Sequence, residues 1–214
     1  MTSSRTVARW GGGLYFLTHV TSVGAVLLYG GASYAADAPL AGRGGVLSGA
    51  VLEILLALGI VGTGVVIHRL VRERSAVTAS GYLALRTLEA SVILAGVVTL
   101  LPLVARPATT TAPGLEPGVE AALRLVHDWT FLIGPGLIVP FHTVLLACHL
   151  WRSRRTPRFI PVLGLVGGPV VGAMNLAVML GFSDVLPLAA VPVFLWEISL
   201  AVWLIARGSD GGGS

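Results

Sequence analysis

The chain alternates long apolar stretches with short polar connections. Six stretches stand out, covering residues 12–35, 46–71, 79–105, 121–151, 160–182 and 185–206. A transmembrane helix needs about 20 mainly apolar residues, and each stretch reaches that length. The pattern predicts an all-α fold, an integral membrane bundle of six transmembrane helices that forms a single domain over residues 1–207.

The fourth stretch is the longest and carries polar residues along one side. Asp128, Pro135, His142 and His149 recur at intervals of seven, so one helix would place them on nearly the same face. Proline removes an amide donor and crowds the preceding turn, so we expect a kink or a break at Pro135 and Pro140. A cavity would form there, beside Asp128. Beyond the prolines, His142 and His149 are interpreted as ordinary helix contacts.

Composition supports the membrane assignment and excludes some chemistry. Of the 214 residues, 55% are hydrophobic and 11% are charged, with a mean hydropathy of +0.86. A soluble domain would have about 25% charged residues. The sequence contains no lysine, which excludes a Schiff base, including a covalently bound retinal. The single cysteine, Cys148, excludes an intrachain disulfide and is interpreted as a small buried apolar residue.

Arginines are concentrated in alternate connections. Those on one side of the predicted bundle are Arg5, Arg9, Arg69, Arg72, Arg74, Arg152, Arg154, Arg155, Arg158 and Arg207. The connections on the other side contain only Arg43 and Arg106. By the positive-inside rule, this asymmetry predicts a multi-pass protein of the plasma (inner) membrane with both termini in the cytoplasm. The basic connection at 152–158 suits anionic lipid headgroups, and nucleic acid is not an expected partner because no soluble domain accompanies the charges.

Two terminal segments need separate interpretations. Arg5 and Arg9 precede an apolar run, and residues 33–35 (Ser-Tyr-Ala) resemble a cleavage site, so a cleaved signal peptide is the alternative to a first transmembrane helix. The run is long for a signal peptide, which favours the helix. Residues 208–214 (GSDGGGS) have the composition of a flexible or engineered linker and are excluded from the fold.

Ionisable side chains from several stretches are expected to meet within the membrane. At a rise of about 1.5 Å per residue, Glu53 and the pair His127 and Asp128 lie about 10 Å inside the outer surface. Each such group costs roughly 2.5–3.5 kcal/mol at the helix centre unless it is paired. Acidic groups outnumber basic ones, so one or two carboxyls should hold a proton at neutral pH, or a cation should lie among them. The candidate ligand-binding or proton-coupling residues are Glu53, Arg86, Glu89, His127, Asp128, Asn175, Trp196 and Glu197.

Simpler interpretations of these residues remain open. Arg86 and Glu89, at i and i+3, can neutralise each other on the third helix. Arg124 can reach Asp128 one turn away, or both can belong to an exposed ladder that begins at Glu120. Histidines in apolar stretches are more often hydrogen-bonded core residues than ligands, which applies to His19 and His142.

The fifth stretch contains small residues at steps of four. Gly164, Gly168 and Gly172 have the spacing that permits close contact between helices in lipid. Helix packing is the favoured interpretation, flexibility for transport is the alternative, and an oligomer could form through this face.

Five segments together resemble a known family. They are GAVLEILLALGIVGT (49–63), RTLEASVILAG (86–96), HDWTFLIGPGL (127–137), PRFIPVLGLVGGP (157–169) and WEISLAVWLI (196–205). They are similar to a bacterial family of membrane proteins known only as domain of unknown function family 4386. The resemblance extends from about Arg9 to Arg207 and implies six transmembrane helices. It implies no substrate and no catalytic residues.

Four functions are compatible with these features. The first is binding or transport of a small hydrophobic or cationic molecule in a carboxylate-lined intramembrane pocket, coupled to carboxyl protonation. The second is an intramembrane enzyme that performs acid-base chemistry on a lipid or isoprenoid, with Trp196 stabilising a carbocation. The third is an accessory membrane subunit whose polar residues only fasten helices together.

A metal site is the fourth and weakest possibility. The ligand types suit iron, manganese or zinc, but no two-ligand motif such as Glu-x-x-His occurs. The candidate ligands are Glu53, Glu89, His127, Asp128 and Glu197. Nucleotide-binding loops and serine-nucleophile motifs are absent from the sequence, so ATP-driven chemistry is not expected, and no cofactor is identified.

Overall fold

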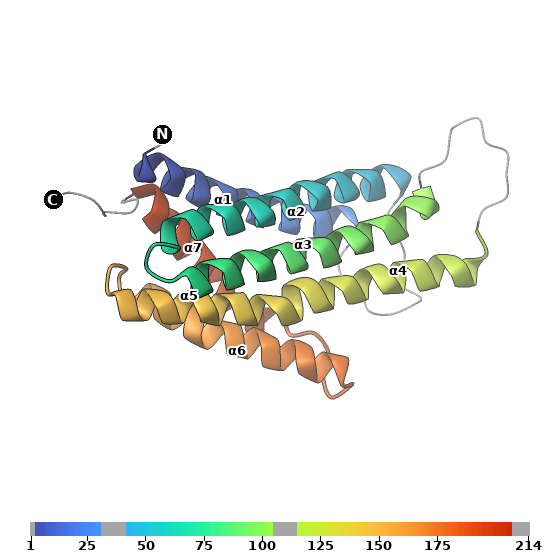
Figure 1. Cartoon of the computed structure of the whole chain (residues 1–214). Helices are drawn as coiled ribbons and strands as arrows, with labels where there is room; N and C mark the ends of the chain where they lie inside the picture. The colour runs from blue at the N-terminus through green and yellow to red at the C-terminus, as the bar shows by residue number, and fades with distance from the viewer. Residues whose placement is uncertain (1–2, 31–41, 105–114, 207–214) are drawn as a thin grey trace.

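The protein is a bundle of long helices (Figure 1). A computed structural model describes residues 3–30, 42–104 and 115–206. Its elements are α1 (Ser4–Leu28), α2 (Arg43–Val71), α3 (Ala76–Val104), α4 (Pro117–Phe131), η1 (Leu132–Ile138), α5 (Val139–Ser153), α6 (Phe159–Met179), η2 (Pro187–Ala190) and α7 (Val191–Ala206). Six helical spans in the described residues are long and apolar enough to cross a membrane, which confirms the predicted all-α, multi-pass architecture. Residues 33–35, most of the 106–118 loop and the 208–214 tail lie outside the described residues.

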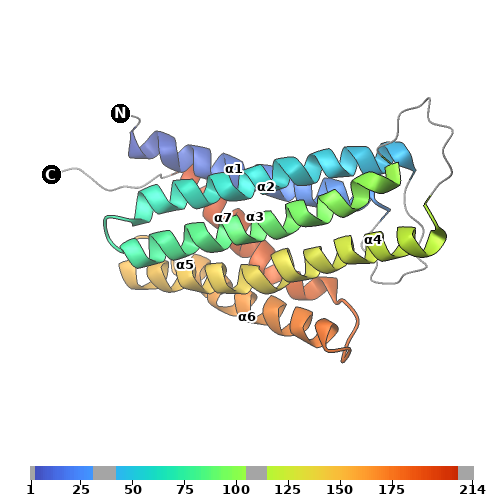
Figure 2. The same cartoon turned by 45° about the vertical axis from the view of Figure 1, so that its right-hand side comes forward.

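The six spans form a closed ring. Each span packs against its neighbours in sequence, and α7 returns to contact α1 (Figures 1 and 2). Side chains that point inward from the six spans therefore lie in one shared interior. The outer surface of the bundle carries exposed large apolar side chains, as expected where helices face lipid. Both ends of the described chain lie at the same end of the bundle as the α2–α3 and α5–α6 connections.

The first helix is displaced from its predicted position of 12–35. It begins at Ser4, because the Ser3 side chain accepts a hydrogen bond from the Thr6 amide and caps the first turn. It ends at Leu28, and Gly30 adopts a positive φ of 90° that terminates many helices. Hydropathy alone placed this helix too late because the polar first turns, with their arginines, still belong to it.

The fourth span stays helical through both prolines. Leu132–Ile138 form a π-helix that contains Pro135 and joins α4 to α5. Proline cannot donate to the carbonyl four residues earlier, and a wider turn relieves the crowding of its ring. Pro140 lies in the first turn of α5, directly after the π-helix. The kink or break expected at Pro135 is therefore a π-helical segment, and the span stays helical through it.

The glycines spaced four apart on α6, Gly164, Gly168 and Gly172, pack against other helices of the same chain. A Cβ added at Gly164 would lie 2.9 Å from both Ala147 of α5 and Trp196 of α7. One at Gly168 would lie 3.0 Å from Val144. The small residues thus bring three helices of one chain together, as the packing interpretation predicted. An oligomer that used this face would have to displace α5 and α7.

Candidate functional site

Two groups of buried polar side chains lie between the apolar layers of the bundle. We call them the Glu53 cluster (Tyr29, Glu53, His127 and Asp128) and the Arg86 cluster (Tyr15, His19, Thr63, Tyr82, Arg86, Glu89, His142 and Glu197). Apolar core clusters lie beyond them toward each end of the bundle. Five of the six spans contribute to the Arg86 cluster, which makes it the centre of the polar interior.

Glu53 is the hub of the first cluster. Its carboxyl accepts a hydrogen bond of 2.7 Å from the Tyr29 hydroxyl, and its Oε1 and Oε2 lie 3.2 and 3.1 Å from Nε2 of His127. The other ring nitrogen of His127, Nδ1, lies 3.1 Å from Oδ1 of Asp128. Glu53 and His127 are 1% and 5% exposed, so these groups interact where water does not screen them.

Two glycines allow this close approach. A Cβ at Gly49 would collide with the Tyr29 ring, which lies over that point of α2 one turn before Glu53. A Cβ at Gly96 of α3 would collide with Oγ1 of Thr130, whose hydroxyl in turn donates to the His127 carbonyl. The absence of both side chains sets the spacing at which the phenol and the imidazole reach one carboxyl.

The contacts of His127 fix how many protons the cluster holds. A carboxylate only accepts hydrogen bonds, so each of the two nitrogen–carboxyl contacts needs one proton. An imidazolium between two carboxylates supplies two protons, and so does a neutral imidazole with one protonated carboxyl. Both arrangements give the three groups a net charge of −1. In either arrangement two protons are shared among the three groups; the protonated carboxyl that the excess of acidic groups led us to expect stays a prediction.

Arg86 is the hub of the second cluster and joins three helices. Its Nε and Nη2 donate to Oγ1 of Thr63 on α2 at 3.1 and 2.9 Å. Its Nη1 lies 3.1 Å from Glu89 on its own helix and 3.5 Å from Oε1 of Glu197 on α7. The sequence pair Arg86 and Glu89 is thus formed, as the simpler interpretation held. It is also part of a larger arrangement in which one guanidinium faces two carboxyls.

His142 extends the cluster to α5. Its Nε2 lies 3.1 Å from Oε2 of Glu89 and 3.4 Å from Nη1 of Arg86. Its Nδ1 is buried and has no hydrogen-bond partner among the described residues. Since the carboxylate of Glu89 accepts, the contact assigns the ring proton to Nε2. His142 is thus the buried, hydrogen-bonded histidine that the sequence favoured, and its contact with Glu89 makes it part of the charged network and more than an ordinary helix contact.

His19 and Glu197 form the most exposed part of the Arg86 cluster. Nδ1 of His19 lies 2.8 Å from the carbonyl oxygen of Tyr15, which can only accept, so Nδ1 carries a proton. Nε2 then lies 3.5 Å from Oε2 of Glu197. If neither atom carries a proton, a lone pair opposes a carboxylate. A proton on either atom would make the contact attractive.

A central cavity opens beside this pair. Its volume is about 210 Å³, and all six spans contribute to its wall. The wall is formed by Thr18, His19, Ser22, Val23, Leu56, Ile60, Arg86, Glu89, Pro135, Val139, Val171, Ala190, Val193, Phe194 and Glu197. Pro135 places the π-helix at the cavity, consistent with the frequent occurrence of π-helical turns at functional sites. The predicted cavity at Pro135 is present, but it lies beside Glu197 and Glu89 rather than beside Asp128.

The chain matches the model of the family described as Domain of unknown function (DUF4386) over residues 11–208. The protein belongs to the DUF4386 family. No curated protein and no solved structure matches it. The family assignment agrees with six membrane spans and assigns no activity, so the function of this DUF4386 protein has to be argued from the two clusters and the cavity.

Two predictions about site residues need correction. The side chain of Asn175 donates to the carbonyl of Val171 on its own helix and packs against Gly136, so it does not join the carboxyls. Trp196 is buried against Gly164 in the apolar core and does not line the cavity. The inward face of α7 at the cavity carries Glu197, while Trp196 is one position, about 100°, around the helix.

Arg124 does not pair with Asp128 in the described part of the chain. The Asp128 carboxyl interacts with the neighbouring His127 ring instead, because that ring is held in place by Glu53. The ladder of Glu120, Arg124 and Asp128 therefore does not form. The outer part of α4 is held instead by the contact between His127 and Glu53 of α2.

Several members of the clusters were not candidates from the sequence. The sequence pattern favoured His19 as a hydrogen-bonded core histidine. Tyr29 was not singled out because it lies at the end of its span. Tyr15 and Tyr82 share a short hydroxyl–hydroxyl hydrogen bond next to Arg86, whose guanidinium lies 5.7 Å from the centre of the Tyr15 ring. The available signal was the inward side of α1, where Thr18 and His19 follow Tyr15 after three and four positions.

The five candidate metal ligands are divided between the clusters. Glu53, His127 and Asp128 lie in one, and Glu89 and Glu197 lie in the other with Arg86 between them. Among the described residues, no group of three histidine, cysteine or acidic side chains has the arrangement to hold a metal ion.

Proposed function

We propose that this DUF4386 protein binds a small amphipathic cation, such as a protonated amine, in the central cavity and exchanges it for the proton held by His19 and Glu197. The observation that carries the proposal is the 3.5 Å contact between this pair on the cavity wall. Arg86 balances one of the two carboxyls near it. The second carboxyl needs a proton or another cation to be neutral.

The shape and lining of the cavity support a ligand with an apolar body. Aliphatic side chains make up most of the wall, and the ring of Phe194 lies edge-on to His19 with ring centres 4.6 Å apart. Val23 of α1 and Phe194 of α7 line the cavity and are exposed, at 53% and 44%. A route between α1 and α7 would let a lipophilic amine enter from the bilayer.

The distribution of charge supports a location and an orientation. Nine of the arginines in the described residues lie in the terminal turns and connections at one end of the bundle (Figure 1). This supports a plasma (inner) membrane protein with that end in the cytoplasm. The central cavity would then take up its ligand from the membrane or the outer side. The direction in which ligand and proton are exchanged would follow the pH difference across the bilayer.

An intramembrane enzyme is less well supported. The sequence hypothesis relied on Trp196 to stabilise a carbocation, and that ring lies in the apolar core away from the cavity. The pair of His19 and Glu197 could still supply a proton donor. Stabilising a carbocation needs aromatic faces, and among the described residues of the cavity wall Phe194 is the one phenylalanine, tyrosine or tryptophan.

Calorimetric titration of the purified full chain with benzylammonium tests the proposal, with neutral benzyl alcohol as the matched ligand. We expect the cation to bind with release of about one proton, and the alcohol to bind at least tenfold more weakly. Glu197→Gln should remove the proton release, and the exposed Glu120→Gln should leave it unchanged. Equal binding of the two ligands, without proton release, would refute the exchange.

A further inference from the structure

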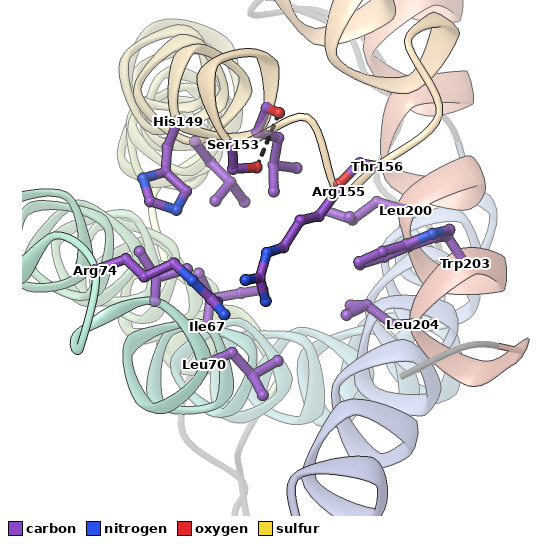
Figure 3. A pocket seen from close by; sticks show the side chains of 13 residues that line it. Ile67, Leu70, Arg74, His149, Ser153, Arg155, Thr156, Leu200, Trp203 and Leu204 are labelled. Carbon is purple, nitrogen blue, oxygen red and sulfur yellow. Dashed lines mark hydrogen bonds between the residues drawn. The ribbon is translucent and has the colours of Figure 1, made fainter. Parts of the chain in front are cut away.

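A second pocket lies at the arginine-rich end of the bundle (Figure 3). Its volume is about 100 Å³, and it shares no residue with the central cavity. Side chains from α2, α5 and α7 and from the two connections at this end form its wall. We call it the arginine pocket, after Arg74 and Arg155.

The two arginines converge on the same space. Arg74 comes from the α2–α3 connection and Arg155 from the α5–α6 connection, and their guanidinium groups extend toward one another across the pocket (Figure 3). Within the described residues, neither guanidinium has a hydrogen bond or an ion pair with a protein group. Both side chains are exposed and could point apart into water. Their convergence therefore indicates that an anion belongs between them.

The buried hydroxyl of Thr156 is a second feature that favours a ligand with hydrogen-bonding oxygens. Thr156 is only 4% exposed, lines the pocket, and its Oγ1 has no hydrogen-bond partner among the described residues. A buried hydroxyl without a partner is unfavourable, so a ligand atom that completes its hydrogen bond would be stabilised. The neighbouring hydroxyl of Ser153 is already used, because it donates to the Leu150 carbonyl at 3.0 Å.

Apart from His149 and Ser153, the rest of the wall is apolar. Leu70 lies below the guanidinium groups in the view of Figure 3, and Trp203 and Leu204 lie to their right. A site with two cations and a hydroxyl above an apolar floor matches a phosphate that is attached to a hydrophobic body. The pocket lies at the end of the bundle, at the level where lipid headgroups meet transmembrane helices.

We propose that the arginine pocket binds a phosphate group, held by Arg74, Arg155 and the hydroxyl of Thr156. The phosphate can belong to the headgroup of an anionic lipid or to a water-soluble phosphate compound. Both sources offer the same oxygens to the same donors, so the experiment has to distinguish them.

Native mass spectrometry of the full chain provides the test. The protein is released from micelles that contain equal amounts of phosphatidylglycerol and phosphatidylcholine, with and without glycerol phosphate. The site variant is Arg74→Gln with Arg155→Gln. The control variant is Arg72→Gln with Arg152→Gln, which removes two exposed arginines from the same two regions without touching the pocket. Thr156→Val and Thr156→Ser separate the hydroxyl from the side-chain volume.

We expect one phosphatidylglycerol to stay bound preferentially, with at least tenfold less retained by the site variant than by the control variant. Thr156→Val should lower retention several-fold, and Thr156→Ser should restore it. Displacement by millimolar glycerol phosphate would identify a soluble phosphate as the ligand, and resistance to it would identify the lipid. Equal retention of the lipid by the site and control variants, with no binding of glycerol phosphate, would overturn the proposal.

Discussion

His19 donates its Nδ1 proton to the Tyr15 carbonyl at 2.8 Å and so presents Nε2 to Glu197, 3.5 Å away. One hydrogen bond inside α1 thus decides which side of the ring faces the cavity. In the proposed exchange the proton would be held by this pair, since the other nearby carboxyl, Glu89, is already paired with Arg86.

The exchange predicts a definite direction for the pH dependence of binding. A cation that replaces one proton binds more tightly as pH rises, by up to about tenfold per pH unit while the pair titrates. Calorimetry with benzylammonium across a pH series measures this slope. His19→Gln and Glu197→Gln should each flatten it, whereas an unchanged slope in both variants would contradict the assignment.

Removal of Arg86 should destabilise the protein strongly. Arg86→Gln leaves the buried Glu89 without its cation, at a cost of about 3–5 kcal/mol in the free energy of unfolding. The double variant with Glu89→Gln should recover part of this loss. Thermal unfolding in mild detergent measures both, with the exposed Arg152→Gln as the control, expected within about 0.5 kcal/mol of the parent.

The Tyr29 hydroxyl should stabilise the protein only through Glu53. Tyr29→Phe removes a 2.7 Å hydrogen bond to a buried carboxyl and should cost about 1–3 kcal/mol. In a Glu53→Gln background the same substitution should cost less, because the charged acceptor is gone. A double-mutant cycle on unfolding free energies gives the coupling. Additive effects would show that the two groups do not interact in solution.

Two glycine substitutions should have opposite effects. Gly96→Ala places a methyl group where Thr130 and His127 lie, and should cost about 1–3 kcal/mol while displacing α4 from the Glu53 cluster. Gly13→Ala meets no atom within 4 Å and should stabilise α1 by about 0.5–1 kcal/mol. Equal effects of the two substitutions on the unfolding temperature would argue against close packing at Gly96.

Much of the candidate site could be predicted from charge in an apolar context. Glu53, Glu89, His127 and Glu197 were identified because an ionisable group within a membrane span is costly and has to be paired. His19 and His142 were identified as buried but not as members of the network, since nothing along the sequence indicates which carboxyl faces a histidine on another helix. Trp196 was assigned to the site from its place next to Glu197, although adjacent residues on a helix face different directions.

The sequence by itself determined the class and the architecture of this protein. Runs of apolar residues specify spans because backbone hydrogen bonds in lipid have to be satisfied within each helix, and this condition is local. Only the tertiary structure decided how the polar residues are divided between two clusters, that the cavity lies at Glu197, and that Arg74 and Arg155 converge. Those outcomes depend on the rotation and spacing of whole helices, which are set by glycine contacts such as those at Gly96 and Gly164 and by the π-helix at Pro135, and not by any single segment.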